Sequence, residues 1–312
     1  MSRIKTIVVG AGHLGRIHTR LANSLDIFDV VGVVDPSSEA RNQFQAELGI
    51  QGFESIDQVP ETLEAAIVAA PTGLHYPICQ SLLEQGTHVL VEKPITITTD
   101  EAKELVELAD RSGAVLQVGH VERFNPAFEK LKEKVSHAKF IETRRMSEYT
   151  FRSTDVGVVL DLMIHDIDLI LWLSQQRCQT VSAWGGYLLG YEVPETLVIV
   201  LEMEKGTICT LESSWLAPSG APANIFGWED SSDAGKGVVD ASLEVVGTKG
   251  SSFLKTYEPS LTINDAQGSY HPDLAFWPQI DGRTTGALRE EIWDFIGFKK
   301  SVHLQQWPSF NA

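Results

Sequence analysis

The stretch Thr6-Ile7-Val8-Val9-Gly10-Ala11-Gly12-His13-Leu14-Gly15 decides the fold of this chain. Its first four residues are β-branched, which predicts a short buried strand, and a helical pattern follows from His13 to Leu25. Between the two, glycines allow a tight turn whose backbone N–H groups meet a pyrophosphate at the helix N-terminus, and the last glycine permits close packing of helix on strand. We therefore predict a dinucleotide site, formed by Gly10, Gly12, His13, Leu14 and Gly15.

An aspartate stands where such a site needs an acid. Asp35 comes about 20 residues after Gly15 and directly follows the apolar run Val30–Val34. Its carboxylate suits the two ribose hydroxyls of NAD and repels the 2′-phosphate of NADP, so NAD is the predicted cofactor. Ser37 leaves room for mixed use. The alternative is a glycine turn followed by an unrelated aspartate, which the combination of strand, helix and spacing disfavours.

The first 121 residues alternate short apolar runs with helical patterns, which predicts parallel βαβ units. We expect a Rossmann domain over residues 1–121, an α/β fold with a doubly wound parallel sheet. Its expected strands are Thr6–Val9, Val30–Val34, Ala66–Ala70, His88–Val91 and Val115–Val118. Its expected helices are His13–Leu25, Ser38–Leu48, Leu74–Gln85 and Asp100–Arg111.

After this part the rhythm changes, and we expect a second domain over residues 122–312, an α+β unit with an open, mostly antiparallel sheet. Its expected helices are one to Lys134, a long one near Val158–Ser174 and a late one near Gly286–Lys300. Its expected strands are one to about Met146, then Trp184–Gly190, Leu197–Glu204, Thr207–Ser213, Ser242–Val246 and Leu261–Ile263. The stretch Ala217–Gly237 is rich in Pro, Gly, Ser and Asp, which predicts a long loop that closes over a site.

Polar or turn-forming segments follow three further predicted strands. They are Ala70-Pro71-Thr72-Gly73-Leu74-His75, Glu92-Lys93-Pro94 and Gly119-His120-Val121-Glu122-Arg123-Phe124-Asn125-Pro126. An isolated Glu-Lys-Pro is more often a surface ion pair, but here consecutive strand ends carry such residues, and ligands of open α/β sheets bind at those ends. The predicted cofactor contacts in these segments are Ala70, Pro71, Thr72, His75, Glu92, Lys93 and Gly119.

The apolar segment Val158–Leu173 carries a polar stripe. Asp161, His165 and Asp168 are spaced i, i+4, i+7 and so share one face of a buried helix. Asp161 is placed to hydrogen-bond His165 and stabilise its protonated form, while His165 takes a proton from a substrate hydroxyl. A satisfied structural pair is the alternative, and a zinc site lacks a third ligand at suitable spacing, so no metal is predicted. Asp166 projects about 100° away and is expected to cap or pair elsewhere.

The composition limits the class of partner. The 312 residues contain 42 acidic and 25 basic side chains, and the net charge of −17 opposes binding to nucleic acid or to an anionic membrane. Cys79, Cys178 and Cys209 are odd in number and widely spaced, which suits neither a disulfide framework nor a zinc site. The N-terminus shows no signal peptide, and the most apolar later segment, Val156–Leu173, contains ionisable groups that exclude an ordinary membrane span. We expect a cytoplasmic protein that binds a small molecule.

Four motifs, GAGHLG, APTGLH, VEKP and LDLMIHDID in this order, resemble those of the glucose-fructose oxidoreductase and inositol dehydrogenase family, Gfo/Idh/MocA. The resemblance covers about residues 3–300. It implies a Rossmann domain followed by an α/β domain whose open sheet covers the nicotinamide and mediates assembly into a homodimer or homotetramer. It also implies three catalytic residues: Lys93, which reaches substrate and nicotinamide, and the pair Asp161 and His165.

Within the family, GHVERFNPA and DVGVVLDLMIHDIDLIL are most similar to bacterial enzymes that oxidise C3 of UDP-N-acetylglucosamine in amino-sugar lipid A synthesis. This resemblance implies an NAD-dependent dehydrogenase of a secondary sugar hydroxyl. The implied substrate contacts are Lys93, Arg123, Asn125, Arg152, Asp161 and His165. Arg144, Arg145 and Arg152 are candidates to meet a diphosphate, with solvated strand and loop charges as the alternative.

Two other functions stay open. A dehydrogenase of inositol or another free sugar needs no nucleotide pocket, and a non-catalytic regulator senses NAD(P) without turnover. The presence of Lys93, Asp161 and His165 argues against the regulator, because a sensor needs no proton relay. The resemblance departs after Lys300, where family members continue with a glycine turn and a further helix, so we expect a divergent or shortened C-terminus.

Overall fold

The computed structural model describes residues 3–60, 62–135, 138–147, 157–190, 192–216, 238–255, 260–271, 279–280, 283–284 and 286–297. The chain forms two compact units, Met1–Gly119 together with Arg289–Ala312, and His120–Leu288. The domain expected over residues 122–312 differs from this division, because the C-terminal helix belongs to the first unit from Arg289 onward. One reason is a hydrogen bond of 3.2 Å from Gln117 Nε2 to the carbonyl oxygen of Glu291.

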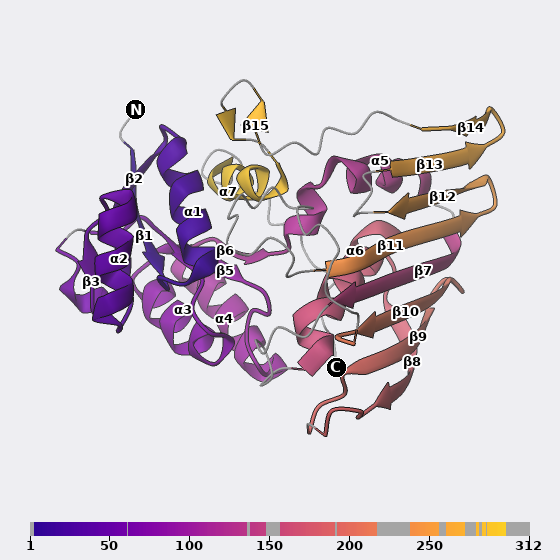
Figure 1. Cartoon of the computed structure of the whole chain (residues 1–312), viewed down its shortest axis with the longest axis horizontal. Helices are drawn as coiled ribbons and strands as arrows, with labels where there is room; N and C mark the ends of the chain where they lie inside the picture. The colour runs from indigo at the N-terminus through magenta and orange to yellow at the C-terminus, as the bar shows by residue number, and fades with distance from the viewer. Residues whose placement is uncertain are drawn as a thin grey trace. The chain divides into compact units, whose positions relative to one another are not determined.

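Six parallel strands make the sheet of the first unit, in the order β3-β2-β1-β4-β5-β6 (Figure 1). This is the order of a doubly wound nucleotide-binding sheet, which confirms the predicted fold class. The strands are β1 (Ile4–Val9), β2 (Phe28–Val34), β3 (Gly52–Phe53), β4 (Ala65–Val68), β5 (His88–Glu92) and β6 (Leu116–Gly119). The helices are α1 (His13–Ser24), α2 (Ser38–Leu48), η1 (Ile56–Gln58), η2 (Thr72–Leu74), α3 (His75–Glu84), α4 (Thr99–Ser112) and α7 (Ala287–Gly297).

Local sequence signals explain where these elements begin and end. All four residues of β4 are buried, and in β5 the residues Val89–Val91 are apolar and buried, as expected for central strands of a sheet covered on both faces. Helix α4 begins at a capping box between Thr98 and Glu101 and ends at Gly113, whose φ of +68° suits glycine. These caps fix the two ends of the helix that connects β5 to β6.

The second unit is built on an eight-stranded sheet in the order β14-β13-β12-β11-β7-β10-β9-β8. Neighbouring strands are antiparallel except β7 and β10, which run parallel, so the expected open and mostly antiparallel sheet is confirmed. The strands are β7 (Ala138–Ser147), β8 (Cys178–Gly186), β9 (Thr196–Met203), β10 (Ile208–Ser214), β11 (Val238–Gly247), β12 (Gly250–Lys255), β13 (Ser260–Asp265) and β14 (Gly268–Tyr270). A separate small sheet pairs β15 (Gln279–Ile280) with β16 (Arg283–Thr284).

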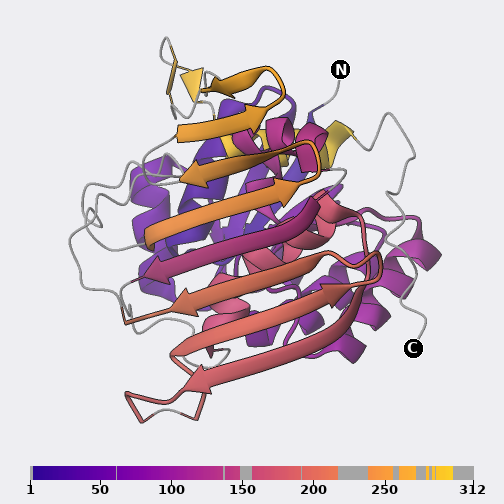
Figure 2. The same cartoon turned by 90° about the vertical axis from the view of Figure 1, so that its right-hand side faces the viewer.

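Helices cover one face of the eight-stranded sheet. They are η3 (Val121–Phe124), α5 (Pro126–Val135), η4 (Val159–Met163) and α6 (Ile164–Ser174). Their apolar residues and the inward residues of the strands form one core, which includes Leu131, Met163 and Leu211. Figure 2 looks onto the other face, which no helix in the described part of the chain covers.

The helix expected over Val158–Ser174 is interrupted. Its first turn, η4, is a π-helix, and the α-helix α6 begins only at Ile164. A π-turn accommodates an extra residue, and the apolar pattern of the segment does not reveal it. Strands β3, β12, β14, β15 and β16 were also not predicted, and the strand expected over Trp184–Gly190 overlaps β8 only at residues 184–186. The predicted loop Ala217–Gly237 lies outside the described residues.

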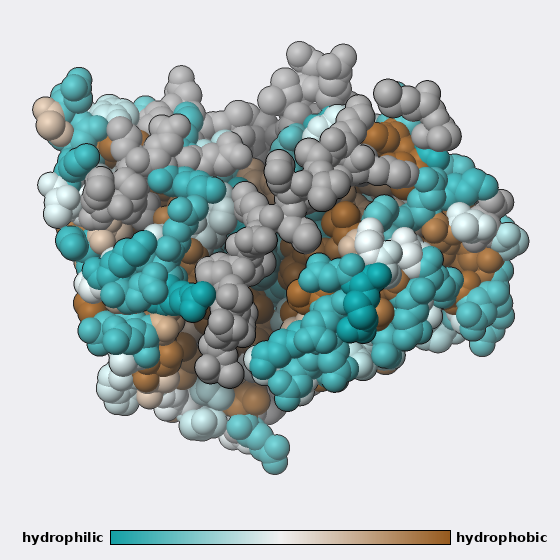
Figure 3. Space-filling model, turned by 180° about the vertical axis from the view of Figure 1, so that it is seen from behind, coloured by the Kyte–Doolittle hydropathy of each residue, from teal (hydrophilic) through white to brown (hydrophobic). Residues whose placement is uncertain are grey.

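The surface agrees with the charged composition. On the side drawn in Figure 3, hydrophilic residues predominate and hydrophobic residues appear as separate patches. Within the described residues, no helix is both long enough and apolar enough to cross a membrane.

Candidate functional site

The glycine turn lies between β1 and α1, and its three glycines have different tasks. Gly10 has a φ of +107°, and a Cβ there would lie 2.6 Å from the carbonyl oxygen of Ala69. A Cβ on Gly15 would lie 1.8 Å from the carbonyl oxygen of Gly10. Gly12, in contrast, has nothing within 4 Å of the position its Cβ would take. The chain itself requires the outer two glycines, while the middle one leaves the open space that a cofactor phosphate needs.

The N-terminus of α1 is prepared for an anion. Gly12 is its N-cap and offers no side chain, and the first turn, which contains the predicted residues His13 and Leu14, has no acidic residue. The first N–H groups of the helix therefore keep their capacity to bind a phosphate, and the helix dipole favours a negative charge there.

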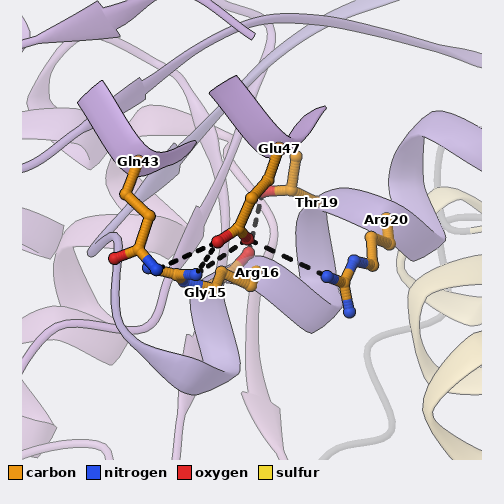
Figure 4. Close-up of polar contacts among 6 residues, drawn as sticks. All are labelled: Gly15, Arg16, Thr19, Arg20, Gln43 and Glu47. Carbon is orange, nitrogen blue, oxygen red and sulfur yellow. Dashed lines mark hydrogen bonds and ion pairs between the residues drawn. The ribbon is translucent and has the colours of Figure 1, made fainter. Parts of the chain in front are cut away.

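A carboxylate on α2 contacts α1 just after the glycine turn and holds this helix in place. Figure 4 shows Glu47 accepting hydrogen bonds of 2.8 Å at both oxygens from Arg16 and one of 3.0 Å from Gln43. Arg20 adds an ion pair at 4.0 Å, and Thr19 Oγ1 donates to the carbonyl oxygen of Gly15 at 2.8 Å. These contacts fix the first turns of α1, and with them the direction in which its first N–H groups point.

Asp35 lies at the carboxyl end of β2 and is tied to the glycine turn. Its Oδ2 accepts a hydrogen bond of 2.8 Å from the backbone N–H of Ala11, and its Oδ1 accepts one of 2.8 Å from the N–H of Ser37. The guanidinium of Arg41 donates to the carbonyl oxygen of the same residue at 2.6 Å. The carboxylate is thus held beside the turn, at the place where ribose hydroxyls bind in dinucleotide sites.

The strand-end turns after β4 and β5 are joined by a buried histidine. His75, which opens α3, has Nε2 at 2.8 Å from the carbonyl oxygen of Ala70 and Nδ1 at 2.8 Å from that of Pro94. In the turn between β4 and α3, Pro71 is exposed and Thr72 is half-buried. The imidazole of His75, predicted as a cofactor contact, is thus occupied with holding two turns together.

At the end of β5, Glu92 and Lys93 differ in burial and in the role of their side chains. Glu92 is buried, and its Oε1 lies 2.6 Å from Nε2 of the buried His18, while its Oε2 accepts a bond of 3.3 Å from the N–H of Lys93. Burial raises the pKa of Glu92, but the hydrogen bond and charge of His18, with Lys93, outweigh it and leave the pKa below its usual value. The carboxylate therefore supports the turn, whereas Lys93 is half-buried and precedes Pro94 through a cis peptide bond.

Gly119 explains part of this arrangement. It pairs with Glu92 across β5 and β6, and a Cβ on it would lie 3.0 Å from Glu92 Oε2. The glycine, which was predicted as a cofactor contact, leaves the space that the buried carboxylate occupies.

In the second unit, the predicted acid and base lie on either side of the junction between η4 and α6. Asp161 belongs to the π-turn, His165 is the second residue of α6, and both are half-buried. Asp161 Oδ2 accepts a hydrogen bond of 3.1 Å from Nε1 of Trp215, a residue that the sequence did not point to. The hydrogen bond between Asp161 and His165 stays a prediction.

The third member of the polar stripe has another role. Asp168 is buried and accepts two hydrogen bonds from Arg123, of 2.7 and 2.5 Å, with His120 Nε2 at 3.6 Å. Asn125 is buried as well, and its Oδ1 accepts a bond of 3.0 Å from the N–H of Ala127 at the start of α5. Both predicted substrate contacts, Arg123 and Asn125, thus have partners within the unit, and their contact with a substrate stays a prediction. Arg152 lies outside the described residues.

Arg145 forms a buried charge cluster that the sequence did not reveal. It donates two bonds of 3.0 Å to Asp166 and one of 3.0 Å to Glu122. Asp166, expected to pair away from the stripe, therefore does so. Burial raises the pKa of Glu122, a rise that Arg145 opposes and Asp166 reinforces. Arg145 is neither a diphosphate ligand nor a solvated charge, because it is buried among its carboxylates. Among the described residues, no group of His, Cys, Asp and Glu is placed to hold a metal ion.

Comparison with known proteins agrees with this geometry. Residues 4–120 match the profile of an oxidoreductase family with an NAD-binding Rossmann fold, and residues 129–252 match the GFO/IDH/MocA C-terminal domain. The UDP-N-acetylglucosamine 3-dehydrogenase of Acidithiobacillus ferrooxidans is 31% identical over 231 residues, which cover 74% of this chain and 73% of the relative. A solved structure of that protein superposes with a TM-score of 0.81 at 26% identity, over 96% of this chain and 90% of the other. The scyllo-inositol 2-dehydrogenase (NAD(+)) of Bacillus subtilis is 27% identical over 286 residues, 86% of this chain and 78% of the relative.

The parallel sheet, the glycine turn and the Asp35 carboxylate define a dinucleotide-binding domain, and the family that it matches is one of NAD-binding oxidoreductases. The chain belongs to the GFO/IDH/MocA oxidoreductase family, as its motifs had indicated. It is an NAD-dependent dehydrogenase that acts on CH–OH groups, like its named relatives.

Proposed function

We propose that this dehydrogenase oxidises a secondary hydroxyl of a sugar, and that the substrate is UDP-N-acetylglucosamine, oxidised at C3 to the 3-keto sugar. The observation that carries the proposal is the 31% identity, over 231 residues, to a relative named for this reaction. The residues that the chemistry requires, Lys93, Asp161 and His165, are present in the sequence. The product would enter amino-sugar lipid A synthesis.

Oxidation of a secondary alcohol breaks its O–H and C–H bonds and leaves a carbonyl group. NAD bound at the glycine turn supplies the acceptor for the hydride, at C4 of its nicotinamide. In the proposal His165 takes the hydroxyl proton, and Asp161 stabilises the imidazolium that results. Lys93 holds the hydroxyl oxygen and stabilises the negative charge that develops on it. The proton on His165 then passes to solvent.

Two substitutions test this assignment. Lys93→Ala and His165→Ala are expected to lower the rate of NAD reduction by about 10² or more, because each removes a group that acts on the reacting hydroxyl. Affinity for NAD, measured by calorimetry, should be retained in both. Lys103→Ala serves as the control, since Lys103 is an exposed lysine of α4. Near-normal turnover in either of the first two variants would contradict the assignment.

A second candidate substrate class has support of its own. The relative from Bacillus subtilis is named a scyllo-inositol dehydrogenase and aligns over 86% of this chain. NAD reduction should therefore be compared with UDP-N-acetylglucosamine, free N-acetylglucosamine, myo-inositol and scyllo-inositol, with identification of each product. Turnover with the nucleotide sugar alone supports the first proposal, and turnover with the inositols supports the second. Tight NAD binding without turnover on any sugar would instead support a regulator.

We also propose that the chain forms a homodimer or homotetramer through its eight-stranded sheet. Support comes from exposed apolar side chains on four strands of that sheet, listed from β9 to β12 as Val198, Ile208, Val246 and Phe253. The three cysteines are free thiols, which fits a reducing compartment such as the cytoplasm.

A further inference from the structure

A buried carboxyl group on α7 has no hydrogen-bond partner among the residues that the structure describes. Glu291 is 1% exposed, and neither of its side-chain oxygens has a partner within the described residues. Its neighbour Glu290 is exposed and pairs with Arg289 at 2.8 Å. A buried carboxylate without donors is costly, so this group calls for an explanation.

The position of Glu291 follows from the contacts of β6. Gln117 of β6 donates its side-chain amide to the carbonyl oxygen of Glu291 at 3.2 Å, so α7 lies against this strand (Figure 1). Across the sheet Gln117 pairs with Leu90, and Gly119 pairs with Glu92, so residues 117 and 119 share the face on which Glu92 lies. The two carboxyl groups of Glu92 and Glu291 therefore belong to the same covered face of the first unit.

The two carboxyl groups differ in their donors. Glu92 accepts hydrogen bonds from His18 at 2.6 Å and from the N–H of Lys93 at 3.3 Å, whereas Glu291 accepts none within the described residues. When two carboxyl groups interact in a buried place, the one with donors keeps the charge and the other keeps a proton. Burial first, then the negative charges of Glu92 and Asp294, raise the pKa of Glu291 well above its ordinary value. Gln117, the neighbour from β6, is uncharged.

We propose that Glu291 is a positioning residue for Lys93: as a neutral carboxylic acid it lets the pair carry a single negative charge, on Glu92, which holds the main chain at Lys93. The importance of Lys93 rests on the proposed function. When Glu291 loses its proton at alkaline pH, a second charge repels that of Glu92. The Glu92 carboxylate then loses its hold on His18 and on the N–H of Lys93, and the turn that carries the lysine loosens.

The proton itself can be tested without any substrate. In the full-length protein at neutral pH, the infrared spectrum should contain the carbonyl stretch of a buried, protonated carboxylic acid. Glu291→Gln should remove this band, and the matched control Glu290→Gln, one residue away on α7, should retain it. Absence of the band from the wild-type protein at neutral pH would overturn the proposal, and that measurement needs no variant.

The pH dependence of the protein's stability should also show whether Glu291 is protonated. The folded-state pKa of Glu291 lies above the ordinary 4.5, so protonation of this group stabilises the folded protein. This stabilisation is fully present below about pH 4.5 and is lost as the pH rises through the raised pKa. The unfolding midpoint of the wild-type protein and of Glu290→Gln should therefore fall, relative to that of Glu291→Gln, as the pH increases. An identical pH dependence in all three proteins would overturn the inference.

The link to the turn needs two further measurements. In NMR spectra the ring signals of His18 should move at the pH at which the infrared band disappears, and should stay in place in Glu291→Gln. In kinetic assays the alkaline limb of kcat/KM should move to higher pH in Glu291→Gln, since the amide never ionises, and not in Glu290→Gln. The positioning role would be overturned if the His18 signals stayed in place while the infrared band disappears. It would also be overturned if the alkaline limb of kcat/KM were at the same pH in Glu291→Gln as in the wild-type protein. If no sugar is oxidised at all, the proposed function fails, while the infrared, stability and NMR results still decide the state of Glu291.

Discussion

At the scale of single residues, replacement of two glycines of one motif by alanine is expected to affect different properties, stability in one case and NAD binding in the other. Gly15→Ala places a methyl group 1.8 Å from the carbonyl oxygen of Gly10, so it should lower the free energy of unfolding by about 1–3 kcal/mol or more. Gly12→Ala meets nothing within 4 Å, and its φ of −74° suits alanine. It should change the free energy of unfolding by less than about 0.5 kcal/mol but weaken NAD binding, because the methyl group enters the space for the phosphates.

Chemical denaturation without cofactor and calorimetry with NAD separate the two effects. A Gly12→Ala protein with unchanged NAD affinity would mean that the phosphates do not approach the chain at this glycine.

The residues of the site were predictable only where one short segment contains the whole signal. The glycine turn and Asp35 are local patterns attached to a strand and a helix, and the structure places them as expected. The partners of Glu92 were not predictable, because His18 is separated from it by 74 positions and stands in an ordinary helical pattern. Trp215 likewise contacts Asp161 across 54 positions. Hydrogen bonds of this kind depend on the tertiary structure, which no local motif records.

At the scale of elements, two adjacent arginines of β7 provide a matched comparison. Arg145 faces the core and joins η3 and α6 through Glu122 and Asp166, whereas Arg144 faces outward and pairs with Glu212 at 3.9 Å. Arg145→Ala should lower the free energy of unfolding by about 3–5 kcal/mol, because it leaves two carboxylates buried without their cation. Arg144→Ala should lower it by about 0–1 kcal/mol.

Urea unfolding of both variants measures the difference. Equal losses would contradict the burial of the charge cluster. From the sequence the two arginines were indistinguishable, since alternation along a strand does not say which face is inward until its neighbours are known.

Helices and strands with clear periods were mostly predicted within a few residues, and the exceptions have physical causes. The π-turn at Val159–Met163 was missed because all of its residues except Asp161 are apolar. Such a pattern does not show which face of the helix is buried, so an extra residue in one turn leaves no trace in it. This turn shifts Asp161 relative to the residues of α6. It explains how the stripe expected from i, i+4, i+7 spacing separates into Asp161, bonded to Trp215, and Asp168, bonded to Arg123.

At the scale of the whole molecule, the uncovered sheet face is the surface on which assembly can be tested. Ile208, Phe140 and Val246 are direct neighbours across β10, β7 and β11, so they form an apolar row on that face. Ile208→Lys should convert the proposed oligomer to monomers, because it buries a charge in this apolar row. Light scattering after gel filtration measures the mass.

Val106→Lys provides the control, since Val106 is an exposed apolar residue of α4 in the first unit. An unchanged mass for Ile208→Lys, or a monomeric wild-type protein, would contradict assembly through this face.

The two units of the structure differ in their bounds from the domains expected from the sequence. The expected change of pattern after residue 121 lies close to the boundary at Gly119 and His120, but nothing in the sequence of α7 indicates that its residues from Arg289 onward belong to the first unit. The contact that documents the return, from Gln117 to Glu291, spans 174 positions.

That return also sets an order of events during synthesis. Chains emerge from the ribosome at roughly 5–20 residues per second, so roughly 10–35 s pass between the appearance of β6 and that of α7, which follows it by 174 positions. Throughout this interval the nascent nucleotide-binding sheet lacks one of its covering helices, while the entire second unit is translated and is free to fold. The unit that begins first is therefore the one that is completed last.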